Sequence, residues 1–407
     1  MLQSELFTKA SRNFPKDEEA VNAKLLTRAG FVEKVSAGVY SFLPLGLRVL
    51  RKIEKIIRDE MERVGGKEIL MPVLHPKENW ETTHRWKVFD VLYKLKSREG
   101  KEFALGPTHE EIVVPLVKKF VNSYKDLPVY LYQIQDKFRD ELRVKSGLLR
   151  GREFLMKDFY SFHTSEGDLD SFYEKMKKAY TQVFSRVHLQ TKVVKASGGT
   201  FSKYSHEFQV LTPVGEDTVF YCEKCDFAEN KEIAEVREGN ACPDCGGKIK
   251  VSQGIEVGNI FKLGTKFSKD FELIYKDEKG KENLVWIGCY GIGVSRLMGA
   301  IVEIFHDERG IIWPETVAPY VSHLIELGEG KAKKLYHDLQ KSGIDVLYDD
   351  RNMSHGEKLT EADIIGIPLR LVQSEKTGAK VEVRKRSEKK TALMTVSQVV
   401  KLLISNL

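Results

Sequence analysis

Two runs of residues constrain the fold of this 407-residue chain more than any others. Residues 136–163, DKFRDELRVKSGLLRGREFLMKDFYSFH, form a basic loop between two strand-like segments, and 288–297, GCYGIGVSRL, is interpreted as a glycine-rich turn that leads into a helix carrying Arg296. Arginine presents a fixed fork of donors to phosphate oxygens and stays charged. Because Arg139 and Arg296 lie on separate elements and Phe154 offers a flat stacking face, the pattern favours a bent nucleoside triphosphate as ligand.

These runs resemble motifs 2 and 3 of the class II aminoacyl-tRNA synthetases, and their wording resembles bacterial-type prolyl-tRNA synthetases. The resemblance extends over about residues 1–400. An arginine-rich loop alone is usually a solvated surface, and a GxG before a helix is usually a turn, but several matches in order favour the family. Further matching segments are LPLGLRVLRKIE at 43–54, GPTHEE at 106–111, YQIQDKFRDE at 132–141 and IEVGNIFKLGTKFS at 255–268.

The periodicity predicts an α+β fold, in which an antiparallel sheet is flanked by helices. Apolar residues at three- and four-residue steps predict a helix over 45–64, and Pro72 follows a short predicted strand, which resembles motif 1, the dimer-forming element of class II synthetases. The other expected helices are 17–29, 109–122 and 168–186, and the expected strands are 68–72, 101–105, 130–139, 153–163, 200–211, 218–222, 255–263, 271–276 and 283–288.

The chain is expected to contain two domains. A class II catalytic domain would span 1–315 and an anticodon-binding domain 316–407, with a linker near WPETVAPY at 313–320. Alternating strand and helix segments after residue 321 predict a small α/β domain with a mixed sheet. The resemblance implies anticodon contacts there, for which Arg351, Lys358 and Lys376 are candidates. The alternative is a solvated charged face.

Four of the five cysteines form two pairs, Cys222-x-x-Cys225 and Cys242-x-x-Cys245, sixteen residues apart. This spacing, within a Cys-rich insert at about 222–250, is typical of a zinc ribbon, since four thiolates suit tetrahedral zinc. Such a closed site would be structural, because no coordination position remains for water. The alternative is a pair of reduced thiol turns without metal.

The resemblance implies roles for the residues that match the family's motifs. Arg139 would bridge the proline carboxylate and the α-phosphate of ATP, and Arg296 would bind the γ-phosphate; these two are the catalytic candidates. Phe154 and Arg296 would hold the adenine between them, and magnesium would bridge the phosphates. The remaining ATP-binding candidates are Glu141, Arg150, Arg152 and Gln209.

A pocket for proline is expected beside the ATP site. Residues two apart on a strand share a face, so Met156, Asp158 and Tyr160 would line the same cleft as Phe154. Thr108 and Glu110 in GPTHEE would bind the secondary ammonium, since a buried cation needs a partner of opposite charge. The expected walls of the ring pocket are His206 and Cys289.

The chain departs from the family in two places. Only about thirty Cys-bearing residues lie between SHEFQVLTPVGED and GIEVGNIF, where many bacterial-type enzymes carry a large editing domain. We therefore expect no hydrolysis of mischarged Ala-tRNA(Pro) within this chain and a separate trans-editing factor. In the motif 2 loop, Arg143-Val144-Lys145-Ser146 replaces the family's usual proline and aromatic residue, so acceptor-end contacts are left open.

The expected activity is ATP-dependent ligation of proline to tRNA(Pro) by a cytoplasmic homodimer. The polar N-terminus lacks a signal-peptide core, no apolar run reaches the length of a membrane span, and the net charge of +6 permits a nucleic-acid partner. One alternative is a synthetase-like paralogue that binds RNA without charging it, and another is a zinc-ribbon nucleic-acid binder. Threonyl, seryl and glycyl enzymes share the architecture, but the GPTHEE and GCYGIG segments favour proline.

Overall fold

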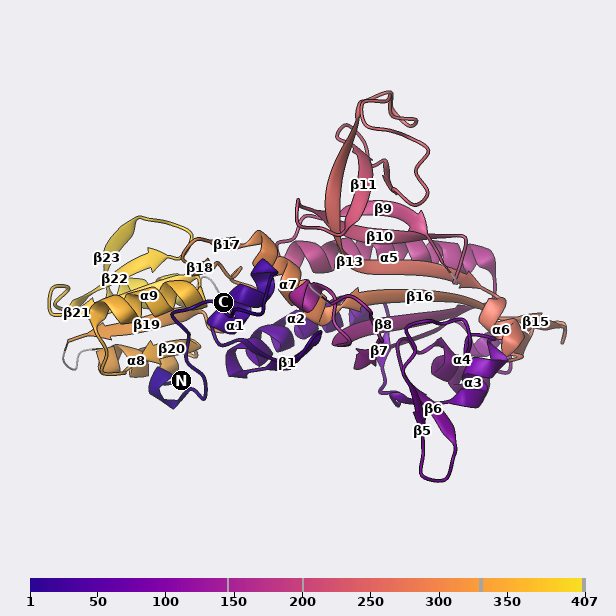
Figure 1. The fold of residues 1–407 in the computed structure, drawn as a ribbon, viewed down its shortest axis with the longest axis horizontal. Helices are drawn as coiled ribbons and strands as arrows, with labels where there is room; N and C mark the ends of the chain where they lie inside the picture. The colour runs from indigo at the N-terminus through magenta and orange to yellow at the C-terminus, as the bar shows by residue number, and fades with distance from the viewer. Residues whose placement is uncertain (145, 200, 329–331, 405–407) are drawn as a thin grey trace.

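The computed structural model describes residues 1–144, 146–199, 201–328 and 332–404. Figure 1 shows an elongated molecule with a large sheet at one end and a smaller, C-terminal sheet at the other. The Cys-rich insert and the β5–β6 hairpin project from the larger sheet in opposite directions. Of the motif 2 loop, Lys145 lies outside the described residues.

A nine-stranded sheet forms the centre of the larger part. Its four middle strands are antiparallel to one another, and only β3–β7 and β12–β9 pair in parallel. The strands in spatial order are β10 (Tyr204–Leu211), β9 (Lys192–Ser197), β12 (Ala228–Asn230), β11 (Asp217–Cys222), β13 (Ile249–Gly264), β16 (Trp286–Gly293), β8 (Glu153–His163), β7 (Val129–Phe138) and β3 (Lys67–Glu68).

One face of this sheet is covered by helices. Helix α5 (Glu166–Arg186) begins where the Ser165 hydroxyl accepts a hydrogen bond from the Asp168 amide, a normal N-cap. Helix α2 (Pro44–Arg63) starts with proline at its first turn, where the missing N–H has no helical partner to lose. Together with α7 (Val294–Ile304), these helices bury the apolar side of the sheet in one continuous core.

Shorter elements surround the sheet. The N-terminal part adds η1 (Gln3–Glu5), α1 (Val21–Arg28), β1 (Val32–Ser36) and β2 (Val39–Phe42). Between motifs 1 and 2 lie β4 (Leu74–Pro76), α3 (Lys77–Thr82), β5 (Lys94–Lys96), β6 (Glu102–Leu105), α4 (Glu110–Lys118) and η2 (Tyr124–Asp126). Later in the chain come η3 (Gly147–Leu149), α6 (Lys266–Asp270), β14 (Ile274–Lys276), β15 (Glu282–Leu284), β17 (His306–Asp307) and β18 (Gly310–Ile311).

The described C-terminal part has a mixed sheet, as predicted, with five strands and three helices. Strand β19 pairs in parallel with both β20 and β21, whereas β22 and β23 continue in antiparallel fashion. Its elements are β19 (Ser322–Leu327), α8 (Ala332–Lys341), β20 (Val346–Asp349), α9 (His355–Ile365), β21 (Leu369–Ser374), β22 (Lys380–Lys385), β23 (Thr391–Thr395) and α10 (Val396–Ile404). The first residues of the chain pack on this sheet, where Leu2 bridges to Tyr348.

The α+β prediction is confirmed, but several elements differ. The segment interpreted as a glycine-rich turn, 288–293, belongs to strand β16 and pairs with both β8 and β13. Among the described residues, several elements had no expected counterpart: helices α3 and α6 and strands β1, β2, β4, β5, β9, β12, β17, β18 and β23. None of the described helices combines the length and the apolar composition needed to cross a bilayer.

Candidate active site

The two faces of the central sheet have different chemistry. The aligned row His206, Ile260, Tyr290 and Phe159 crosses four strands, and its members face α5, where Phe159 packs against Phe172. Neighbouring residues on each strand point the other way. Most of the residues that the sequence analysis predicted to bind ATP or proline lie on that opposite face. We therefore call it the site face.

A cluster of buried polar side chains forms where the GPTHEE loop meets β8 and β16. The Thr108 hydroxyl donates to Glu110 Oε2 at 2.6 Å, and the Cys289 thiol donates to Glu110 Oε1 at 3.2 Å. The Tyr160 hydroxyl accepts the His109 amide at 3.0 Å. All these side chains are buried, so the structure brings Thr108, Glu110, Tyr160 and Cys289 together as expected.

Asp158 adjoins this cluster through Tyr160. It accepts hydrogen bonds from Gln133 at 3.0 Å and Tyr160 at 3.1 Å, and it pairs with the buried Lys137 ammonium at 2.8 Å. Burial by itself would raise the pKa of Asp158, but Lys137 and then His109 outweigh burial and hold the pKa below its ordinary value. Because its oxygens already have protein partners, Asp158 orients Tyr160 rather than offering a carboxylate to a ligand.

Two guanidinium groups approach the neighbouring part of the site face. Arg139 follows β7 directly, donates to the Pro107 carbonyl at 3.3 Å and lies 5.2 Å from the centre of the Phe154 ring. Arg296, in the first turn of α7, donates to the Glu256 carbonyl at 2.9 Å and to its carboxylate at 3.0 Å. Burial and then the positive charge of Arg296 lower the pKa of Arg139. This arrangement of two cations beside an aromatic ring suits a polyphosphate.

A strip of strand without bulky side chains lies between these groups. Gly291 pairs with Asp158 and Gly293 with Met156, so both glycines face the site. A Cβ added at Gly291 would meet nothing nearer than Met156 Sδ at 3.8 Å. Gly291 therefore leaves open space over β16, and a requirement for space, rather than a turn, accounts for glycine at this position.

The remaining residues of the motif 2 loop are held in different ways. Arg152 donates to the Glu141 carbonyl at 3.0 Å, whereas Arg150 is exposed and pairs with Glu216 at 3.2 Å. Arg150 and Arg296 both line one small hollow. Arg150 is therefore better placed than Arg152 to meet a ligand.

Gln209 lies on the site face next to several carboxylates. Its amide donates to Glu207 at 2.9 Å and Asp217 at 2.7 Å. Burial and then Glu256 raise the pKa of Glu207 to about 8. Several carboxylates are therefore close together beside Arg296, and a divalent cation bound there would reduce the repulsion between them.

His206 is not part of this cluster. It faces α5, where its Nδ1 lies 2.8 Å from the Tyr173 hydroxyl, and burial followed by Lys177 lowers its pKa to about 4. Since adjacent strand residues face opposite sides, the structure separates His206 from Thr108, Glu110 and Cys289 by the sheet itself.

Asn22 of α1 is a buried residue near the site that the sequence analysis did not identify. Its Oδ1 accepts the Leu148 amide at 2.9 Å, and its Nδ2 donates to the Ser146 carbonyl at 3.1 Å and to Glu303 at 2.7 Å. Glu303 belongs to α7. Asn22 therefore ties the motif 2 loop to the helix that carries Arg296.

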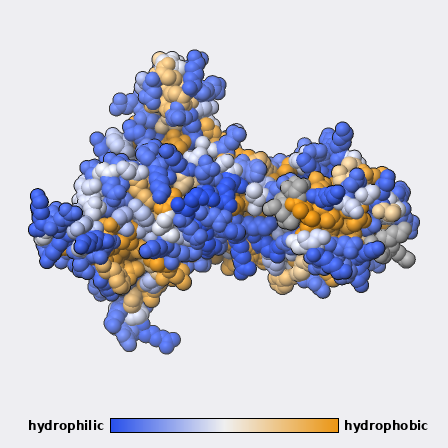
Figure 2. Space-filling model, turned by 180° about the vertical axis from the view of Figure 1, so that it is seen from behind, coloured by the Kyte–Doolittle hydropathy of each residue, from blue (hydrophilic) through white to orange (hydrophobic). Residues whose placement is uncertain are grey.

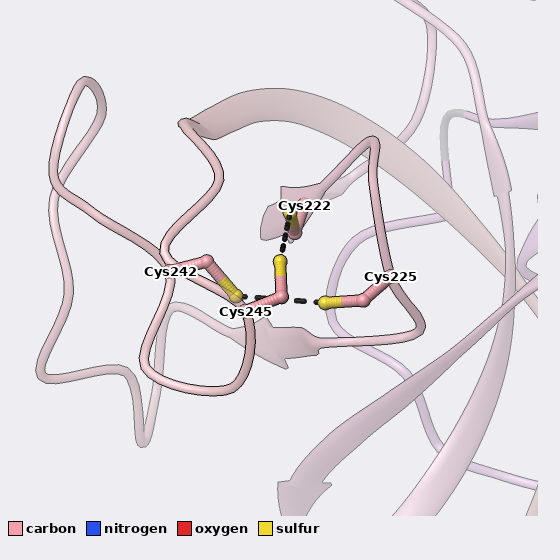
Figure 3. Close-up of side chains that lie close together, drawn as sticks. All are labelled: Cys222, Cys225, Cys242 and Cys245. Atoms are coloured by element: carbon pink, nitrogen blue, oxygen red, sulfur yellow. Dashed lines mark hydrogen bonds between the residues drawn. The ribbon is translucent and has the colours of Figure 1, made fainter.

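The four paired cysteines converge at the tip of the insert (Figure 3). Cys222 and Cys245 have their sulfurs 3.6 Å apart, and Cys225 and Cys242 have theirs 3.5 Å apart. All four sulfurs lie within 4.8 Å of one another. These separations exceed a disulfide bond of about 2.05 Å and approach the edge of a tetrahedron with zinc–sulfur bonds of about 2.3 Å. A Cβ at Gly247 would come within 2.9 Å of Cys222 Sγ.

The C-terminal candidates divide into buried and exposed residues. Arg351 pairs with Asp349 at 2.9 Å and Glu361 at 2.9 Å, and Lys358 donates to two backbone carbonyls while only 5% exposed. Both cations therefore act within the fold. Lys376 is exposed on the turn between β21 and β22.

Comparisons with known proteins agree with this geometry. Residues 93–305 match the family "tRNA synthetase class II core domain (G, H, P, S and T)", and 317–406 match the family "Anticodon binding domain". A solved prolyl-tRNA synthetase from Cryptosporidium parvum, in complex with L-proline and AMP, has the same fold, with a TM-score of 0.77, 19% identity, and coverage of 94% of this chain and 75% of that one. The chain therefore contains the core domain of a class II aminoacyl-tRNA synthetase.

Relatives with higher sequence identity show which family within the class II synthetases this chain belongs to. The proline–tRNA ligase of Halothermothrix orenii is 36% identical, with 91% of this chain and 93% of the relative covered. That of Aquifex aeolicus is 35% identical, with 95% of each covered. The chain belongs to the proline–tRNA ligase family.

One relative also differs in length. The protein of Syntrophomonas wolfei is 34% identical and both chains are fully covered, yet the alignment extends over 568 positions. This chain has 407 residues. The relative therefore contains inserted residues that this chain lacks.

Proposed function

We propose that this chain activates L-proline with ATP and then transfers the prolyl group to the 3′ end of tRNA(Pro). In the first step a proline carboxylate oxygen bonds to the α-phosphorus, the bond to the β,γ-diphosphate breaks, and prolyl-adenylate and pyrophosphate form. In the second step the tRNA hydroxyl attacks the activated carbonyl and AMP leaves. Besides family membership, the principal support is the Thr108–Glu110–Cys289 cluster on the same sheet face as Arg139 and Arg296.

The residues of the site face have complementary roles. Glu110 and Thr108 bind the secondary ammonium, and Met156, Tyr160 and Cys289 line the ring pocket. Arg139 lies between the carboxylate and the α-phosphate, so it neutralises charge that develops as the new bond forms. Arg296 binds the γ-phosphate and, with Phe154, borders the adenine.

The polar groups at the edges of the site complete the binding of ATP. Glu141 accepts from the adenine amino group, and Arg150 faces the phosphates. Magnesium, held by carboxylates such as Glu256 and Glu207, would neutralise phosphate charge. Gln209 orients Glu207 and Asp217 toward this cation.

The first experiment is proline-dependent ATP–pyrophosphate exchange, with alanine, threonine and glycine measured in parallel. Strong exchange with proline and weaker exchange with alanine supports the proposal. No exchange with any amino acid, from folded protein that still binds tRNA, would favour the non-catalytic paralogue instead.

Zinc is proposed to occupy the four-cysteine site, where it would supply structural cross-links. We predict one zinc per chain by elemental analysis, and its loss in Cys245→Ser. Structural zinc contributes about 10–16 kcal/mol to folding in small zinc-finger peptides, so trypsin should then cleave rapidly between residues 223 and 248. Cys289→Ser is the control and should retain zinc. Wild-type protein without zinc, yet resistant to trypsin in the insert, would contradict the prediction.

A homodimer is proposed to form through the apolar surface of α4 and β7. Phe120 is 71% exposed and Leu70 is 76% exposed, and Figure 2 shows apolar side chains gathered on this face beside the β5–β6 hairpin. The hollow there is lined by Ile69, Leu116, Val117, Phe120, Val121, Val129 and Leu131. A surface this apolar is typical of a subunit interface.

Phe120→Asp is predicted to convert the dimer to monomers in sedimentation experiments. An unpaired carboxylate in an apolar contact costs several kcal/mol, so the dissociation constant should rise by about 100-fold or more. Val88→Asp, at a position 67% exposed and outside the hollow, is the matched control. Equal dissociation constants for the two variants would place the interface elsewhere.

The C-terminal domain, which we place at 316–407 after a catalytic domain of 1–315, is proposed to bind the anticodon of the tRNA, with Lys376 among its contacts.

Alanine is smaller than proline, and a pocket discriminates by only about 1–3 kcal/mol per methylene. Because this chain lacks residues inserted in a longer relative, we propose that a separate factor hydrolyses Ala-tRNA(Pro). The cytoplasm is the proposed compartment.

A further inference from the structure

Two adjacent carboxylates, Glu110 and Glu111, lie at the start of α4 with no exposed surface. Glu110 belongs to the buried cluster proposed to bind the amino acid, where Thr108 and Cys289 donate to it. Glu111 accepts from the Thr83 hydroxyl at 2.9 Å and has no part in that cluster's hydrogen bonds. Two like charges so close and so deeply buried are unfavourable without positive charge nearby.

Arg85 supplies one positive charge. Its side chain is 3% exposed, and its Nη1 lies 2.7 Å from Glu111 Oε1 but 3.5 Å from Glu110 Oε2. The guanidinium carbon is 4.7 to 5.6 Å from the ring centres of Trp80, Phe89, Phe201 and Phe267. These rings fix the guanidinium next to Glu111, where its positive charge opposes the rise in the pKa of Glu111 that burial causes.

The other basic groups of this region do not neutralise Glu110. Burial, followed by Lys137, lowers the pKa of His109 to about 4, and burial with His109 lowers that of His75 to about 3, so both rings are neutral. Lys137 is paired with Asp158 at 2.8 Å. Arg139 contacts the Pro107 carbonyl and lies where the substrate carboxylate is proposed. Among the described residues, the carboxylate pair therefore retains one negative charge.

We propose that Arg85 is a positioning residue for amino-acid recognition: it cancels the charge of Glu111, so that Glu110 alone meets the secondary ammonium of the substrate. This inference rests on the proposed function. Guanidinium stays charged and binds carboxylate in a fixed geometry, which suits a permanent partner. The ammonium then supplies the one missing charge, and an uncharged or anionic ring compound would leave the pair unbalanced.

Removal of either partner should disturb the pocket, and removal of both should restore it. In Arg85→Met, the two carboxylates have no counter-ion and share one proton between them, so the negative charge presented to the ammonium falls and the KM for proline rises by about 100-fold. In Glu111→Gln, Arg85 turns to Glu110 and competes with the ammonium, which raises the KM by about tenfold or more. The double variant Arg85→Met/Glu111→Gln keeps one carboxylate and no guanidinium, so its KM should return to within about tenfold of wild type.

The experiment measures proline and ATP KM values for wild type and the three variants in pyrophosphate exchange, with folding checked by thermal melting. The KM for ATP should change by less than threefold, as a rough limit, throughout. The proline KM of Arg85→Met should also fall as pH rises, because the carboxylate pair loses its proton.

Two results would overturn the inference. A double variant as impaired as folded Arg85→Met would reduce Arg85 to a packing residue. If Arg85→Met does not fold, a wild-type proline KM in the near-isosteric Glu111→Gln variant is equally decisive. Absence of exchange in wild type would instead refute the proposed function, so the two failures are distinguishable.

Discussion

The substitution Arg139→Ala is expected to lower kcat for proline-dependent pyrophosphate exchange by about 1,000-fold or more, as for other arginines that stabilise phosphoryl transfer. Arg139 is held by the Pro107 carbonyl and by the Phe154 ring, so it needs little reorganisation when charge develops on the α-phosphate. Its contact strengthens in the transition state, and loss of it should therefore reduce kcat more than it raises the KM for either substrate.

Arg139→Lys tests the geometry of this contact. Lysine keeps the charge but loses the fork of donors, so a partial recovery of kcat is expected. Arg98→Ala, on the exposed β5–β6 hairpin, removes an arginine without touching the site and should exchange at the wild-type rate. A folded Arg139→Ala protein whose kcat stays within tenfold, as a rough limit, of wild type would contradict the assigned role.

Strand periodicity predicted the site face well where the strand was long. The alternation from Phe154 to Tyr160 places Asp158 and Tyr160 in hydrogen-bond contact, because a period of two is a fixed property of extended chain. Alternation does not reveal which face meets the ligand. His206 illustrates this limit, since its neighbours Ser205 and Glu207 share the site face while His206 faces α5.

Residue type alone also misled where burial changes a side chain's role. Arg351 and Lys358 have the composition of an RNA contact, yet their charges are used by Asp349, Glu361 and backbone carbonyls. The glycines of β16 were interpreted as a turn because sequence does not distinguish conformational freedom from the need for space. Gly291 is in extended strand and provides space.

The residues that the sequence analysis missed hold other site residues in place and are not themselves expected to contact a substrate. Asn22 and Arg85 lie in segments without a motif that suggests chemistry. The partners of Asn22 are at least 124 positions away in the chain, and the two carboxylates beside Arg85 are at least 25 positions away. Only the folded chain brings Asn22 to Leu148 and Glu303. One weak signal existed for Arg85, a charged residue set among aromatic ones in WETTHRW at 80–86.

Glu110→Gln is expected to raise the KM for proline by about 100-fold while the KM for ATP changes little. Truncation of one partner of a buried charge pair costs about 2–5 kcal/mol, and each 1.4 kcal/mol is about tenfold in affinity. Glutamine keeps the size of the side chain, and its amide oxygen can still accept from one of the two donors, Thr108 or Cys289, which donate to different oxygens of Glu110 at 2.6 and 3.2 Å. The main interaction lost is therefore the charge that faces the ammonium.

Two comparisons separate this charge effect from packing. Thr108→Val removes one hydroxyl and keeps the carboxylate, so a smaller rise in KM, about tenfold, is expected. Glu99→Gln neutralises an exposed carboxylate on the β5–β6 hairpin and should leave both KM values unchanged. Because proline brings a permanent cation into a pocket with one uncompensated carboxylate, a folded Glu110→Gln enzyme with wild-type proline KM would mean that the ammonium binds elsewhere.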